Sequence, residues 1–77
     1  MRVLLVENNV RYAAAITADL NADAIRVEVA GSGEDALYIM RDYEFDLVLL
    51  NQRLPDMEGA TLISRIRASK HDTPIIA

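Results

Sequence analysis

The residues best suited to chemistry follow two apolar runs of the chain. Glu7, Asn8 and Asn9 come directly after the first run, and Asn51 comes directly after a second run near the middle. If these runs form neighbouring parallel strands, the polar side chains meet at one edge of the sheet. Mg²⁺ binds oxygen ligands there, usually including one or two carboxylates. One carboxylate beside three neutral amides carries little charge, so the set predicts a pocket shaped like a metal site, with no cofactor and at most weak Mg²⁺ binding.

The strands that would position these residues are readable from hydrophobicity. Arg2–Val6 and Asp46–Leu50 are continuous apolar runs, which is typical of strands buried on both faces. Ile25–Val29 alternates apolar and charged residues, which predicts a half-exposed strand at the sheet edge. Thr73–Ala77 predicts the beginning of a fourth strand.

Helices are expected between these strands. Apolar residues recur at helical spacing from residue 10 to about 21, from 33 to about 42 and from 59 to about 69. Asn8 or Asn9 is placed to cap the first helix, and Ser32 the second.

The alternation of strands and helices defines the expected fold class. It predicts an α/β fold with a doubly wound parallel sheet of four strands, three connecting helices on both faces and right-handed crossovers. A single small domain over residues 1–77 accounts for the whole chain. In such sheets the functional crevice lies at the carboxyl ends of the strands, where the chemically capable residues fall.

Composition excludes several function classes. The 77 residues contain no cysteine and one histidine, His71, so thiolate sites are absent and a Ser/His enzyme is poorly supported. The net charge of −4 disfavours direct nucleic-acid binding. No apolar stretch approaches the roughly 20 residues that span a bilayer. These observations predict a cytoplasmic protein that contacts neither nucleic acid nor membrane.

Three segments resemble the receiver domain of bacterial two-component response regulators, of the CheY-like superfamily and the OmpR and CtrA type. They are Val3-Leu4-Leu5-Val6-Glu7-Asn8-Asn9, Phe45-Asp46-Leu47-Val48-Leu49-Leu50-Asn51 and Leu54-Pro55-Asp56-Met57-Glu58-Gly59. The resemblance covers the whole chain in order. It implies the flavodoxin-like and CheY-like form of the doubly wound sheet.

The resemblance also assigns positions in the pocket. The family's acidic pair falls on Glu7 and Asn8, its phosphoacceptor aspartate falls on Asn51, and the backbone carbonyl that completes its magnesium site falls on Arg53. Asn8 and Asn51 depart from the pattern, because the family usually has aspartate at both. A carboxylate attacks a phosphoryl donor to form an acyl phosphate, which a carboxamide does not do. The resemblance therefore implies a pocket lacking both its nucleophile and a metal ligand.

The family's docking region and its remaining elements lead to further expectations. In receivers, the exposed side of the first helix docks a histidine kinase or phosphotransfer protein, and this region falls on Arg11, Ala14 and Ala15. A full receiver continues with a helix, a strand and a final helix, so the chain is expected to be a partial receiver domain. Uncovered apolar surface and a bare strand edge then predict self-association.

Three functional hypotheses follow. The first is a pseudo-receiver without enzymatic activity, which acts independently of phosphorylation by binding a kinase, a phosphotransfer protein, another regulator or itself. The second is a phosphoacceptor still active through an engineered residue 51, or through Asp56 or Glu7. The third is a flavodoxin-like ligand binder, which the absence of a Gly-rich loop between Val6 and Val10 disfavours.

Overall fold

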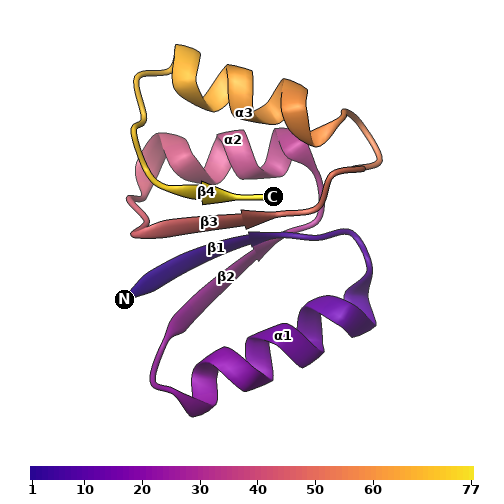
Figure 1. The fold of residues 1–77 in the computed structure, drawn as a ribbon, viewed down its shortest axis with the longest axis vertical. Coiled ribbons are helices and arrows are strands. Elements are labelled where there is room, and N and C mark those ends of the chain that lie inside the picture. Colours follow the sequence, from indigo (N-terminus) through magenta and orange to yellow (C-terminus); the bar gives the residue numbers. More distant parts are fainter.

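The computed structural model describes all of residues 1–77 as a four-stranded parallel sheet with three helices. The elements are, in chain order, β1 (Arg2–Val6), α1 (Val10–Ala22), β2 (Arg26–Ala30), α2 (Gly33–Asp42), β3 (Leu47–Leu50), α3 (Gly59–Ala68) and β4 (Ile75–Ile76). The strand order is β2-β1-β3-β4, and all four arrowheads point the same way (Figure 1). This confirms the α/β, doubly wound prediction.

The sheet register brings the carboxyl ends of β1 and β3 together. β1 lies between β2 and β3, with Val6 opposite Ala30 on one side and Leu50 on the other. The two loops that carry the pocket residues therefore leave the sheet side by side, at the carboxyl ends of neighbouring strands (Figure 1). β2 is an edge strand, as its alternating pattern predicted, and lies one residue later than the predicted range.

The main core lies between the sheet and the helices α2 and α3. Leu4, Val48, Leu62 and Ile66 have no exposed surface, and the other members of this core cluster are Val6, Ala30, Ala36, Met40, Phe45 and Leu50. Burying one such leucine or isoleucine side chain contributes about 1.5–3 kcal/mol. This packing fixes the base from which the loop after β3 projects.

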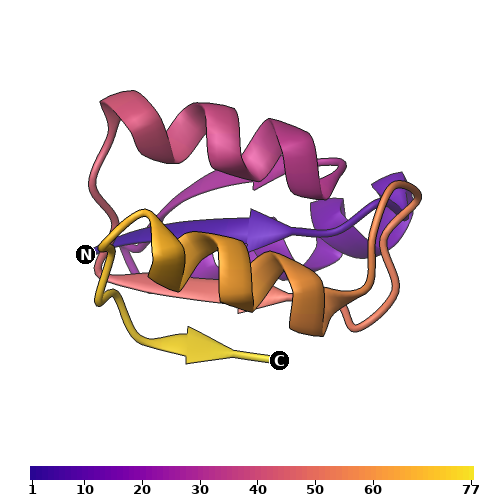
Figure 2. The same ribbon diagram turned by 90° about the horizontal axis from the view of Figure 1, so that it is seen from above.

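The opposite face of the sheet is covered only in part. α1 contacts β2 and lies apart from α2 and α3 (Figure 1). Leu47 and Leu49 face the same side as Val3 and Leu5, their register partners, but remain half-buried. The prediction that the third strand is buried on both faces is thus wrong for this face, because no helix covers β3 there. β4 lies at the sheet edge, directly before the C-terminus (Figure 2).

Two of the helices are capped at their N-termini by side chains. Asn9 Oδ1 accepts a hydrogen bond from Tyr12 N at 3.0 Å, so Asn9 rather than Asn8 caps α1. Ser32 Oγ accepts from Asp35 N at 3.1 Å, which confirms the predicted cap of α2. Such caps stabilise a helix by about 1 kcal/mol. None of the three helices combines the length and the apolar character needed to cross a membrane.

Candidate functional site

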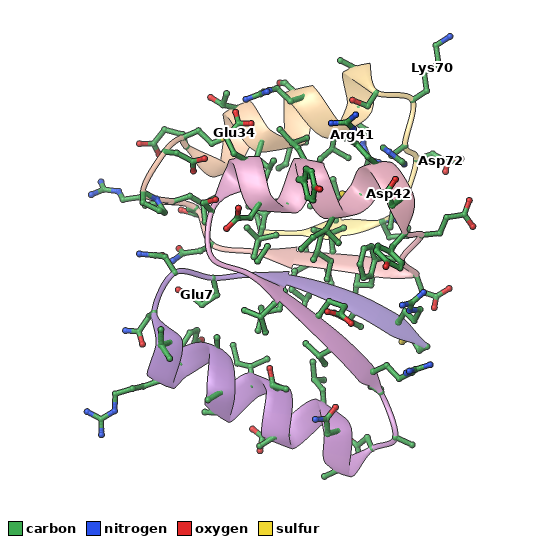
Figure 3. The ribbon with its side chains drawn as sticks, turned by 180° about the vertical axis from the view of Figure 1, so that it is seen from behind. Glu7, Glu34, Arg41, Asp42, Lys70 and Asp72 are labelled. Carbon is green, nitrogen blue, oxygen red and sulfur yellow. The ribbon has the colours of Figure 1, made fainter.

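The pocket at the carboxyl edge of the sheet brings Glu7, Asn8 and Asn51 together. Glu7 follows β1 at the point where the chain turns toward α1 (Figure 3). Asn51 follows β3, and its backbone N–H donates to the Val6 carbonyl at 3.0 Å, so the ladder between the strands continues into the pocket. Residues 44 positions apart in the chain are therefore in direct contact.

The Asn51 amide uses both of its ends in this pocket. Its Nδ2 lies 3.2 Å from Glu7 Oε2 and 3.4 Å from Asn8 Oδ1, and it donates to both oxygens. Its Oδ1 accepts from the backbone N–H of Arg53 at 3.3 Å. An amide NH₂ group has two donors, and here both are directed at acceptor oxygens. Both ends of the Asn51 amide are therefore paired with protein groups.

Glu7 is the single carboxylate in this network and is 7% exposed. Its Oε2 also accepts from Asn9 N at 2.9 Å, so this oxygen takes two hydrogen bonds. Burying a charged carboxylate requires such partners, because an unpaired ion loses its hydration without compensation. Glu7 therefore depends on the Asn51 amide and on the turn at Asn9.

The residues present do not fit a resident Mg²⁺ ion. Mg²⁺ requires close, near-octahedral oxygen ligands and favours anionic ones. The pocket offers Glu7, whose Oε2 is already doubly hydrogen-bonded, and the neutral Asn8 and Asn51. An NH₂ group points at the two oxygens that would have to face a cation, and an N–H donor repels a cation.

Arg53 lies at the base of the loop after β3, where the sequence predicted a metal-directed carbonyl. Its backbone N–H, not its carbonyl, contacts Asn51, and its side chain is exposed. The residue also pairs with Glu58 in an isolated antiparallel bridge. Arg53 thus links the pocket to the ordered loop that follows.

The predicted docking residues Arg11, Ala14 and Ala15 are all exposed on α1. Ala14 lines a cavity of about 560 Å³ between α1 and β2, which extends to Glu7 and Asn8. Two neighbours that the sequence did not single out as docking residues are exposed apolar side chains, Val10 at 81% and Tyr12 at 59%. Nothing in the helical pattern distinguished them, since apolar residues at helical spacing are usually buried.

Asp56, an alternative acceptor in the sequence analysis, has a structural role that sequence reasoning missed. Its Oδ1 accepts from Gly33 N at 2.9 Å and its Oδ2 accepts from Glu34 N at 2.8 Å, so it caps α2 from the loop after β3. These two backbone hydrogen bonds, from Glu34 and then Gly33, are the main cause of a lowered pKa of the Asp56 carboxyl. The first turn of any helix has free N–H donors, but the sequence gives no sign of a partner 23 residues away.

The fold and the pocket define a receiver-type signalling domain. Residues 3–77 match the response regulator receiver domain family, and the chain belongs to that family. It is 36% identical over 76 residues to the cell cycle response regulator CtrA of Brucella ovis, a match that covers 99% of this chain and 33% of that protein. The chain thus spans about a third of this relative.

Solved structures agree with this assignment. The non-phosphorylated receiver domain of HemR from Leptospira biflexa is 36% identical with a TM-score of 0.87, and the match covers 96% of this chain and 60% of that one. The response regulator TrrA from Thermotoga maritima, solved in complex with Mg²⁺ and BeF, is 27% identical with a TM-score of 0.89, covering 96% and 64%. TrrA has also been solved in complex with the histidine kinase ThkA.

Proposed function

We propose that this domain is a pseudo-receiver, a signalling module that acts through binding and accepts no phosphoryl group. The observation that carries the proposal is the Asn51 amide at the acceptor position, donating to Glu7 and Asn8. An acyl phosphate forms when a carboxylate oxygen attacks phosphorus. The Asn51 oxygen belongs to a neutral amide and is held by Arg53 N, so it is a poor nucleophile.

The amide also takes over a structural task of a cation. A bound Mg²⁺ would neutralise facing oxygens, and the two N–H donors of Asn51 do this with partial positive charge instead. The pocket residues are therefore hydrogen-bonded to one another without metal or phosphate. Such a domain presents a constant surface to its partner.

The partner class follows from the family and from α1. The relative TrrA is solved with a histidine kinase. On this chain the exposed apolar residues Val10 and Tyr12, beside Arg11, Ala14 and Ala15, offer a surface next to the pocket. We infer that a histidine kinase, a phosphotransfer protein or another cytoplasmic regulator docks there, and that the chain also self-associates.

The alternative acceptors Asp56 and Glu7 are both engaged. Both oxygens of Asp56 accept backbone hydrogen bonds from α2. Glu7 is buried, and its Oε2 accepts two hydrogen bonds. Attack through Asp56 would require an oxygen to give up its bond to α2, and the Glu7 carboxylate is buried, so neither residue supports a second functional proposal.

Acetyl phosphate treatment with Mg²⁺, read by intact mass, tests the proposal. The unaltered chain is expected to gain no phosphoryl group, and Asn8→Asp/Asn51→Asp is expected to gain one. The same treatment of Asn8→Asp alone is the matched control, because it restores a metal ligand without a nucleophile at residue 51.

A phosphoryl adduct on the unaltered chain would overturn the pseudo-receiver proposal. Asp56→Ala and Glu7→Gln would then identify the acceptor by loss of the adduct. If no chain gains a phosphoryl group, the double variant included, the rest of the domain does not support phosphorylation even with both aspartates. That result would contradict the view that the two amides alone disable the pocket.

A further inference from the structure

The loop after β3 is fastened to the start of α2 by Asp56. The carboxylate bridges the N–H groups of Gly33 and Glu34, the first two residues of the helix. The hydroxyl oxygen of Ser32 accepts a hydrogen bond from the third N–H group, that of Asp35. The first turn of α2 is thus capped partly by its own flank and partly by a loop that is distant in sequence.

Close packing reinforces this contact. A Cβ placed on Gly33 would lie 2.5 Å from Met57 Sδ and 2.7 Å from Met57 Cγ, so the loop rests directly on the helix backbone. Gly33 is buried beneath Met57. We refer to the contacts of Asp56 and Met57 with Gly33 and Glu34 as the clasp.

The clasp is connected to the pocket through the base of the same loop. Asn51 Oδ1 accepts from Arg53 N, Leu54 N donates to the Met57 carbonyl at 3.1 Å, and Gly59 N donates to the Gln52 carbonyl at 2.7 Å. The Arg53–Glu58 bridge closes the loop further. A loop held together in this way moves as one piece, so a shift at its base changes the position of its tip.

The clasp also reaches the outer surface of α2 and α3. Glu34, whose N–H is held by Asp56, forms an ion pair with Arg65 of α3, with Nη1 and Oε1 2.6 Å apart. Glu34 lies at the start of α2 beside α3 (Figure 3). Arg65 also contributes to the lowered pKa of Asp56, the smallest of the causes.

We propose that Asp56 is a positioning residue that couples the pocket to the first turn of α2, so that a change at Asn51 is transmitted to the Glu34–Arg65 surface. Energetic coupling of this kind needs a contiguous path with a measurable response at both ends. The path here runs from Asn51 through Arg53 and the loop to Asp56. The proposed coupling does not depend on whether the pocket accepts a phosphoryl group.

NMR of the ¹⁵N-labelled chain tests the coupling. Asp56→Asn removes the charge and leaves one acceptor oxygen. It is expected to raise amide exchange about tenfold at the residue, Gly33 or Glu34, that loses its acceptor oxygen, as expected from losing one hydrogen bond. It is also expected to shift the side-chain NH₂ signals of Asn51. The matched control is Asp35→Asn, which removes a charge from the same helical turn without touching the loop and is expected to leave the Asn51 signals unchanged.

The reciprocal experiment starts from the pocket. Asn51→Ala is expected to raise exchange at Gly33 and Glu34, because coupling between two sites is reciprocal. This second variant decides the matter if Asp56→Asn fails to fold. Unchanged Asn51 signals in Asp56→Asn would overturn the coupling, as would unchanged exchange at Gly33 and Glu34 in Asn51→Ala.

Discussion

At the scale of single residues, the exchange of a carboxylate for an amide decides what the pocket can do. Asn51 donates where an aspartate would accept, so the sign of its interaction with Glu7 Oε2, 3.2 Å away, is reversed. A carboxylate at the same place would face another carboxylate and a neutral oxygen. A cation between them stabilises that arrangement, whereas without one the two carboxylates repel each other.

Asn51→Asp is therefore expected to lower the free energy of unfolding by about 1–3 kcal/mol without metal, since it replaces a hydrogen bond to a charged acceptor by like-charge repulsion. Mg²⁺ should restore part of the loss, and EDTA should remove that gain. Urea denaturation with and without Mg²⁺ measures both. The control is Asn21→Asp on the exposed end of α1, which adds the same charge far from Glu7 and should show no Mg²⁺ dependence. Equal Mg²⁺ effects in both variants would contradict the argument.

Asp56 predicts a pH dependence of stability at the same scale. Its pKa is lowered below the ordinary value of 3.8, first by the hydrogen bond from Glu34 N and then by that from Gly33 N. A carboxyl with a lower pKa in the folded state binds its proton more weakly there than in the unfolded state. Its contribution to stability is complete above the unfolded value and is lost as the pH falls through the lower folded value.

The stability difference between the unaltered chain and Asp56→Asn is thus expected to be largest near neutral pH and to shrink below about pH 4. Urea denaturation at a series of pH values measures it. A difference that grows with acidity would mean that the carboxylate form does not hold the helix.

At the scale of elements, the hydrophobic pattern predicted all seven strands and helices, with ends displaced by two residues at most. β1 is buried on both faces, as its continuous apolar run predicted, whereas β3 is fully buried only on the face toward α2 and α3. The difference has a physical cause. A run of apolar residues reports that a strand is buried, but not which helix covers which face. The meeting of Glu7 and Asn51 was predictable, because parallel neighbours end together.

The cap of α2 by Asp56 was not predictable in this way. Local patterns identify caps that lie within a few residues of the helix, such as Ser32, but a cap from another loop depends on tertiary packing. The direction of the Asn51 amide was equally hidden, since it depends on which neighbours accept and which donate. The sequence thus predicted that Glu7 and Asn51 would meet, and only the fold defined their hydrogen bonding.

Two glycines that flank Ser32 provide an element-scale prediction. Gly33→Ala places a methyl group within 2.7 Å of three Met57 side-chain atoms, whereas a Cβ at Gly31 meets nothing within 4 Å. Gly33→Ala is expected to cost about 1 kcal/mol, because the flexible Met57 side chain has to move aside, and Gly31→Ala less than about 0.5 kcal/mol. Chemical denaturation compares them. Adding Met57→Ala to Gly33→Ala should recover part of the loss, and no recovery would show that Met57 is not the obstacle.

At the scale of the whole molecule, the helices cover the two faces of the sheet to different extents. The helices α2 and α3 bury one face. The other face has α1 against β2 and leaves a cavity of about 300 Å³ near β4. Leu49 and Ile76 line this cavity, and β4 has a hydrogen-bonded neighbour on one side only. An open strand edge beside apolar surface favours pairing with another chain.

Self-association through this edge is the last prediction. The chain is expected to form dimers as its concentration rises, and Ile76→Lys is expected to weaken the dimer about tenfold or more, because Ile76 is an exposed apolar residue of the edge strand and lysine opposes edge pairing. Sedimentation equilibrium measures the association constant. Tyr38→Lys is the matched control, since Tyr38 is a comparably exposed apolar residue on α2, away from β4, and its replacement should leave the dimer intact. A chain that stays monomeric at all concentrations, or one that both variants weaken equally, would show that the β4 edge is not the contact.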